Sequence, residues 1–197
     1  MRRVKGFTLV ELIVVVAIIA ILAAVVTPNA FRAIEKAKIS STIADIKAIR
    51  AAAYDFYTDT GTLPCTKAGG WGADPGFVRP ITPSNCWPNE GGCNQGCTNI
   101  SGWDGPYLEK WPQSGRWLLG GGGKYNWNRW PNFIAPGTAV RCSLAGIVTL
   151  EVYGAISVKA LQEIDRVLDD GNLSSGYVWV EGPINNPSYL QCLVTCH

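Results

Sequence analysis

Three sets of residues in this sequence have types and spacings that could support chemistry. Glu11 is the only ionisable side chain between Phe7 and Val26, a stretch otherwise fit for a lipid bilayer. An acidic cluster, Asp165, Asp169 and Asp170, lies close to Asn172. The third set is seven cysteines, all far downstream of the apolar stretch: Cys65, Cys86, Cys93, Cys97, Cys142, Cys192 and Cys196.

The cysteines are best explained as disulfides formed outside the cytosol, because the first 64 residues contain none. Seven thiols allow three bridges and leave one cysteine that is buried or links subunits. Cys93-Asn-Gln-Gly-Cys97 and Cys192-Leu-Val-Thr-Cys196 could together form a four-thiolate zinc site, but export favours their oxidation first. "CLVTCH" differs from a haem attachment motif by its third spacer residue, and no second histidine is present to bind iron.

The acidic cluster has the oxygen ligands that calcium prefers. Acidic residues before "DGN" at a helix end are, however, more often a solvated turn. We therefore assign no metal and no cofactor from the sequence, and calcium is the ion that the pattern leaves open.

An enzymatic role is not indicated. The single histidine, His197, ends the sequence, and no serine or cysteine sits in a recognisable nucleophile motif. Nucleic-acid binding is not expected either, because outside Arg2, Arg3 and Lys5 the 14 remaining basic residues face 15 acidic ones. Five tryptophans could stack on sugars, but core and interface packing is the preferred interpretation: Trp103, Trp111, Trp117, Trp127 and Trp130.

The segment that carries Glu11 is predicted to span a membrane. A helix over residues 7–26 is about 30 Å long, which matches the hydrocarbon thickness of a bilayer. Its Leu, Ile and Val content outweighs the cost of one carboxylate near its end. The preceding "MRRVKG" places that end in the cytoplasm. A secretory signal cut near Ala23-Ala24 is the alternative, although its apolar core would be shorter.

The same helix is predicted to continue to about Tyr57 with an amphipathic pattern, and Gly61 and Pro64 end it. Pro28 lies inside it and predicts a kink. Downstream, the sequence predicts strands near 125–127 and within 146–154, a helix capped by Ser157 and ended by Gly171, and a strand in "GYVWVEG".

The leader "KG|FTLVELIVVVAIIAIL" resembles the class III signal of type IV pilins and type II secretion pseudopilins. The resemblance implies that a prepilin peptidase cuts between Gly6 and Phe7 and methylates the Phe7 amine. It also implies that subunits stack their N-terminal helices into a filament, with Glu11 opposite the Phe7 amine of a neighbour. "GWDGPYLEKWP" resembles a segment found after the long helix in these families. By the same analogy, Cys142 pairs with Cys192 or Cys196, whereas the calcium loop of major pseudopilins has no match here.

Together these observations predict an α+β, pilin-like fold in which a long N-terminal helix packs on a small antiparallel sheet with a loop-rich, disulfide-stapled head. The expected parts are a cleaved leader (1–6), the helix (7–57, with 7–26 as the membrane or filament-core span) and the head (58–197). We expect a homopolymer, assembled by inner-membrane machinery from a membrane pool into an extracellular type IV pilus. A type II secretion pseudopilin, with a periplasmic filament, is the alternative within the family. A membrane-anchored binding protein that never polymerises, for instance on carbohydrate, is the alternative from another class.

Overall fold

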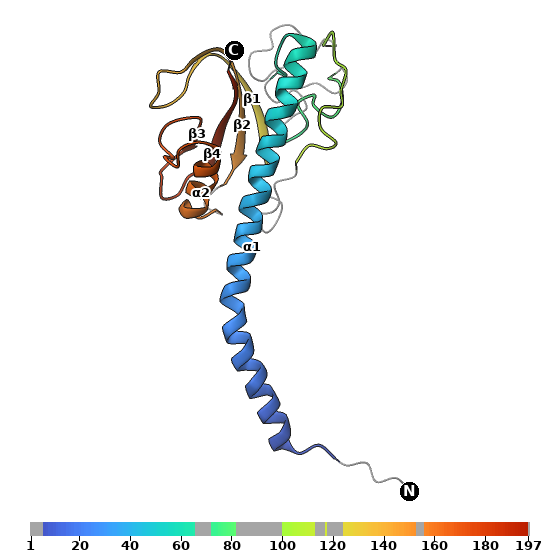
Figure 1. Cartoon of the computed structure of the whole chain (residues 1–197), viewed down its shortest axis with the longest axis vertical. Helices are drawn as coiled ribbons and strands as arrows, with labels where there is room; N and C mark the ends of the chain where they lie inside the picture. The colour runs from blue at the N-terminus through green and yellow to red at the C-terminus, as the bar shows by residue number, and fades with distance from the viewer. Residues whose placement is uncertain are drawn as a thin grey trace. The chain divides into compact units, whose positions relative to one another are not determined.

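The structure, a computed structural model, describes residues 6–65, 72–81, 100–112, 117, 124–152 and 156–196. Its elements follow in the order α1 (Leu9–Thr60), β1 (Tyr125–Ile134), β2 (Arg141–Glu151), α2 (Val158–Leu168), β3 (Val178–Glu181) and β4 (Tyr189–Cys196) (Figure 1). The chain divides into two compact units, Met1–Lys38 and Ile39–His197.

Helix α1 is longer at its C-terminal end than the sequence pattern predicts. It ends at Thr60, where Gly61 adopts a φ of 68° and donates its N–H to the Tyr57 carbonyl at 2.8 Å. A positive φ is the conformation for which glycine is favoured at a helix end. Pro28 lies within the helix, and the kink expected there stays a prediction.

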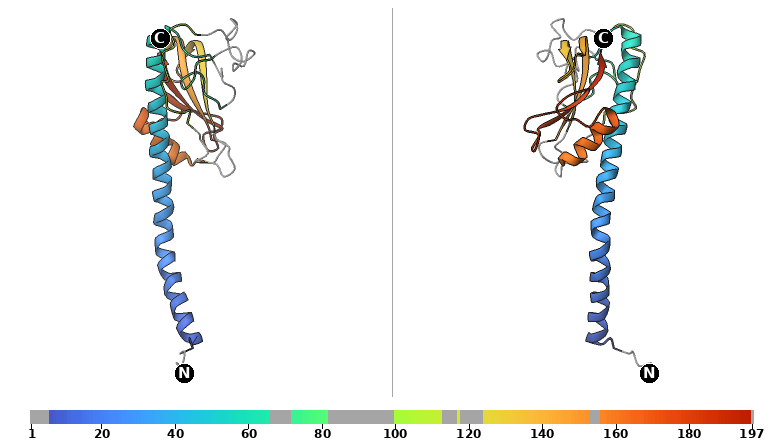
Figure 2. Two further views of the ribbon diagram at one scale, coloured as in Figure 1. Left: turned by 90° about the vertical axis from the view of Figure 1, so that its right-hand side faces the viewer. Right: turned by 60° about the vertical axis from the view of Figure 1, so that its left-hand side comes forward.

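The four strands form one antiparallel sheet in the order β1-β2-β4-β3 (Figures 1 and 2). The register places Val148 of β2 between Trp127 of β1 and Cys192 of β4. Strand β4 is absent from the sequence-based interpretation. Six consecutive residues of β4 are buried, so it lacks the alternation that identifies a half-exposed strand.

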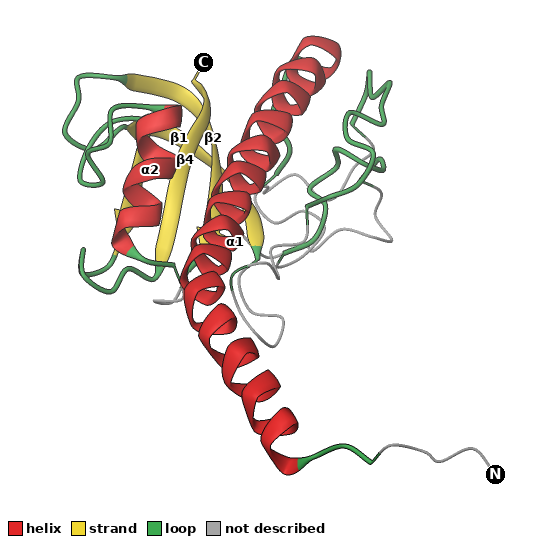
Figure 3. Cartoon of the chain, turned by 60° about the horizontal axis from the view of Figure 1, so that its bottom comes forward, coloured by secondary structure: helices red, strands yellow, loops and turns green. Residues whose placement is uncertain are grey.

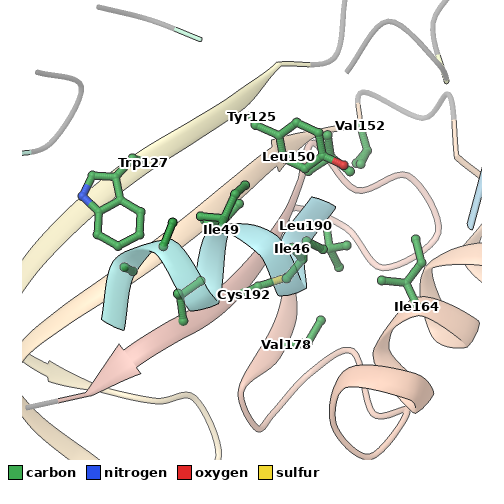
Figure 4. Close-up of a cluster of buried hydrophobic side chains, with 14 of the residues drawn as sticks. Ile46, Ile49, Tyr125, Trp127, Leu150, Val152, Ile164, Val178, Leu190 and Cys192 are labelled. Atoms are coloured by element: carbon green, nitrogen blue, oxygen red, sulfur yellow. The ribbon is translucent and has the colours of Figure 1, made fainter. Parts of the chain in front are cut away.

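Helix α2 and the part of α1 that follows Lys38 pack on one face of this sheet (Figure 3). The N-terminus of α2 is confirmed, since Ser157 caps it and accepts a hydrogen bond from the Ala160 N–H at 3.1 Å. Figure 4 shows Ile46 of α1 beside Leu190 of β4. The core on this face is apolar, and among its buried residues are Ile46, Ile49, Phe56, Trp127, Val148, Leu150, Ile164, Val178 and Leu190.

The opposite face of the sheet carries a smaller apolar cluster. Phe133 of β1 stacks on Trp179 of β3 with ring centroids 5.6 Å apart. A disulfide joins Cys142 of β2 to Cys196 of β4, with 5.0 Å between their Cα atoms. The head therefore has a sheet packed on both faces and two neighbouring strands linked covalently.

Candidate functional site

The N-terminal part of α1 presents an apolar surface to its surroundings. Every residue from Phe7 to Val26 is exposed, and Phe7 itself is 76% exposed. Apolar side chains left in water are unfavourable by about 25 cal/mol for each Å². This segment therefore needs lipid or other protein around it. By length and composition, α1 is sufficient to cross a membrane.

Glu11 and Thr8 form a reciprocal cap at the first turn of α1. The Glu11 Oε2 atom accepts hydrogen bonds from the Thr8 N–H at 2.9 Å and from the Thr8 hydroxyl at 2.8 Å. The Glu11 N–H donates to Thr8 Oγ1 at 3.3 Å. This arrangement is a capping box. It fixes the direction of the carboxylate within a single subunit, at the helix end where negative charge is favoured.

The capping box is a functional feature that the sequence interpretation missed. Its signal, Thr8-Leu-Val-Glu11, is the T-x-x-E spacing that marks a helix start. The interpretation paired Glu11 with the Phe7 amine and did not consider a contact with Thr8. Thr8 is therefore a second residue that positions the expected assembly carboxylate.

The bond expected to be cleaved lies just outside this cap. Gly6, Phe7 and Thr8 precede the first helical residue, Leu9, and all three are exposed. A peptidase needs an accessible, non-helical stretch of backbone. The local geometry at Gly6 and Phe7 meets that need.

The described cysteines are in two chemical states, disulfide-bonded and free. Cys142 and Cys196 are bonded to each other, Cys65 is also in a disulfide, and Cys192 is a buried free thiol. Burial, as the largest cause, raises the pKa of the Cys192 thiol to about 12. Cys86, Cys93 and Cys97 lie outside the described residues, as does His197. In the structure, the two cysteines of "CLVTC" have different states, one bonded and one a free thiol.

Most of the five tryptophans are engaged inside the head. Trp111 and Trp127 are buried and donate their indole N–H groups to the carbonyls of Tyr125 (3.2 Å) and Pro64 (2.9 Å). The half-buried pair, Trp103 and Trp117, donate to the Gly76 carbonyl (2.8 Å) and the Thr42 hydroxyl (3.0 Å). Trp130 is 47% exposed. Four of the five therefore serve packing, as the sequence interpretation preferred.

The segment "GWDGPYLEKWP" also packs within the head. The Tyr107 hydroxyl donates to Asp59 at 2.8 Å near the end of α1, and the ring of Tyr107 lies 5.5 Å from that of Phe56. The backbone N–H of Tyr107 donates to the Phe77 carbonyl at 2.7 Å. This segment holds the loop region against the last turns of α1.

Comparison with known proteins agrees with this arrangement, in which an apolar, capped helix is followed by a small head of helix and antiparallel sheet. A model of the prokaryotic N-terminal methylation motif matches residues 1–27. These features place the chain among type IV pilins and type II secretion pseudopilins. A second family model, described as PilW, C-terminal, matches residues 33–131, just over half of the chain. The chain belongs to this family.

Curated relatives from both branches are similar to the chain. It is 43% identical over 68 residues to the type II secretion system core protein G of Pseudomonas aeruginosa. The aligned segment covers 34% of this chain and 48% of the relative. The corresponding protein of Vibrio cholerae is 36% identical over 92 residues, covering 47% and 61%. The type IV wide pilus major component PilA4 of Thermus thermophilus is 62% identical over 37 residues, covering 19% and 28%.

The similarity is partial in length. The chain spans about half the length of several of the curated relatives it matches. No solved structure matches it.

Proposed function

We propose that this chain is a structural subunit that polymerises through the N-terminal part of α1 into a type IV pilus-like surface filament. The observation that carries the proposal is the exposed apolar surface of Phe7–Val26, interrupted by one capped carboxylate, on a helix whose last turns pack in a folded head. Stacked copies of this segment bury that surface against one another once it leaves the lipid.

Glu11 gives the stack its axial register. Cleavage after Gly6 creates an amine at Phe7, which is cationic near neutral pH because an α-amino group titrates at about 8. Inside a filament, the amine and the carboxylate are both removed from water, and each alone would be a costly buried charge. Pairing Glu11 of one subunit with the Phe7 amine of its neighbour neutralises both groups.

The proposed partners are the proteins that cleavage, methylation and assembly of the chain require. A prepilin peptidase cuts between Gly6 and Phe7 and methylates Phe7, and inner-membrane machinery draws subunits from the membrane pool into a homopolymer. The precursor resides in the inner membrane and the product is extracellular. We propose no catalytic activity for the chain.

A type II secretion pseudopilin is the second candidate. The curated similarity to secretion core protein G over 68 to 92 residues favours it. The cysteine-rich and Trp-rich head favours a surface pilus, because the resemblance to major pseudopilins implies a more compact head than this one. In the pseudopilin case the filament stays in the periplasm.

One experiment separates the candidates. In a native host, deletion of the gene is combined with mechanical shearing of cells and with an assay for secretion of folded exported enzymes. Loss of sheared filaments containing this chain, with secretion intact, supports the pilus. Loss of secretion without sheared filaments overturns the pilus in favour of the pseudopilin. If deletion changes neither filaments nor secretion, and the chain of the undeleted host is recovered only in the membrane, the chain is a non-polymerising binding protein.

A further inference from the structure

Two basic residues follow the predicted membrane span on α1 and have no part in the proposed assembly mechanism. Arg32 and Lys36 are four residues apart in the helix, so their side chains lie on the same side of it. Both residues are exposed. Among the described residues, neither side chain forms an ion pair or a hydrogen bond, whereas Glu35 and Lys38 each have an interaction partner in the chain. The two cations are therefore available to a ligand.

Helix geometry places this pair at the level of the lipid headgroups. The predicted span ends at Val26, and at about 1.5 Å per residue Arg32 lies about 9 Å and Lys36 about 15 Å further along the axis. The headgroup layer adds about 5 to 7 Å on each side of the hydrocarbon core. Side chains of an α-helix tilt toward its N-terminus, so both long side chains lean back toward the bilayer. Arg32 reaches the phosphates directly, and Lys36 lies within a Debye length of about 8 to 10 Å from them.

Two apolar side chains continue the apolar surface of α1 into the same layer. Phe31 is 68% exposed and Ile34 is 51% exposed. They are three residues apart and share one side of the helix, which differs from the side of Arg32 and Lys36. A helical segment with apolar side chains on one side and cations on another has the composition of segments that lie at the boundary of headgroups and acyl chains.

The basic residues near the span are distributed against the usual rule for membrane proteins. Lysine and arginine are enriched on the cytoplasmic side, where the three basic residues of "MRRVKG" are predicted to lie. The segment 27–38 carries three more on the opposite side. Under the proposed function, cleavage removes the three of the leader. Arg32 and Lys36 then supply positive charge to the membrane surface on the far side alone.

We propose that Arg32 and Lys36 bind the phosphate groups of anionic phospholipids, such as phosphatidylglycerol, in the leaflet opposite the leader. The inference rests on the membrane pool of the proposed function. Lipid is preferred to an acidic surface of a second subunit, because the pair directly continues the membrane-spanning surface of Phe7–Val26 and is complementary in charge to phosphate. The contact holds cleaved subunits at one depth in the bilayer, with Glu11 near the other surface, until they are extracted.

The test uses the full-length chain in vesicles of phosphatidylcholine that contain a trace of spin-labelled phosphatidylglycerol or of spin-labelled phosphatidylcholine. The fraction of each label that the protein immobilises gives its preference for the anionic lipid. The wild type is compared with Arg32→Gln, Arg32→Lys, the double variant Arg32→Gln/Lys36→Gln and the control Arg79→Gln. Arg79 is an exposed basic residue of the other compact unit. The leader is the same in every variant, so a difference belongs to the substituted residues.

We expect each substitution by glutamine at Arg32 or Lys36 to reduce the preference for phosphatidylglycerol by about fivefold, which is the contribution of one cation at an anionic surface. Arg32→Lys and Arg79→Gln should match the wild type, because the first keeps the charge and the second lies outside the segment. High salt should diminish the difference between the variants. An unchanged preference in the double variant would overturn the proposal.

Filament yield from the same variants separates this inference from the proposed function. It is measured by shearing cells of the native host. A double variant that keeps its lipid preference but forms few filaments would overturn the proposal and assign the pair to a contact between subunits. A double variant with reduced lipid preference, in a host where even the wild-type chain forms no filaments, would support lipid binding and overturn polymerisation instead.

Discussion

At the scale of single residues, Thr8 and Glu11 show how a carboxylate is held in a fixed direction at the start of an apolar helix. The capping box satisfies N–H groups of the first turn that have no partner within the helix. The carboxylate is thereby fixed in direction before any neighbour arrives. A preorganised charge loses less conformational entropy when it pairs.

Replacement of Glu11 should separate insertion from assembly. We expect Glu11→Ala and Glu11→Gln to insert and to be cleaved, because the apolar segment and Gly6 are unchanged. Filament yield should fall strongly, since breaking a buried ion pair costs about 3 to 5 kcal/mol and leaves the amine unpaired. Immunoblots of sheared and cell-bound fractions measure the yield. Glu35→Ala, which removes a carboxylate from the same helix outside the apolar run, is the control, and normal yield from both Glu11 variants would show that the carboxylate has no assembly role.

Cys192 should behave as a core residue rather than as a reactive thiol. Its pKa of about 12 means that almost no thiolate forms at pH 8, and its side chain is buried. Alkylation with iodoacetamide should therefore fail in the native protein and proceed after denaturation. Peptide mapping without reduction locates the label and also tests the three disulfides expected from the sequence. Rapid labelling of Cys192 in the folded chain would contradict its placement in the core.

At the scale of elements, the buried face of α1 in the head should dominate the stability of that unit. Phe56 is fully buried, and its ring lies 5.7 Å from that of Phe77 in an edge-to-face contact. Phe56→Ala should lower the free energy of unfolding by about 3 to 5 kcal/mol. Tyr54→Ala is the matched control, because Tyr54 is 49% exposed on the same helix. Urea unfolding followed by tryptophan fluorescence measures both, and equal losses would contradict the assigned face.

Periodicity and capping signals predicted both helices, because these signals are local. The apolar spacing from Ile39 to Phe56 and the Ser157 cap are both present in the structure. The strands were harder to predict. β1 continues through Pro131 and through Asn132, whose φ is 52°, and both residues normally interrupt a strand. β4 is a central strand, so its residues show no alternation to detect.

The residues of the candidate site also differ in how far the sequence predicts them. Gly6, Phe7 and Glu11 could be predicted because they belong to a leader motif of a few adjacent residues. The burial of Asp165 depends on how α2 packs against β3 and the rest of the head, and the sequence alone does not show which of several aspartates faces the core. The partner of Cys142 likewise depended on the register of β4 against β2, which set Cys196 opposite Ala145.

At the scale of the whole molecule, two units have different physical requirements. In the unit Met1–Lys38, the described residues 6–37 are all exposed and include the apolar helix surface, whereas Ile39–His197 contains a core and a disulfide. A unit of the first kind is stable only in lipid or in a helical assembly. A chain that combines the two suits a subunit that moves from a membrane into a polymer.

The most direct test of this account is the intact mass and N-terminal sequence of the chain recovered from sheared extracellular filaments of the native host. We predict filaments built of this chain, with each copy beginning at an N-methylated Phe7. A chain that is absent from every filament fraction, or that begins at Met1 or just after Ala24, would contradict it.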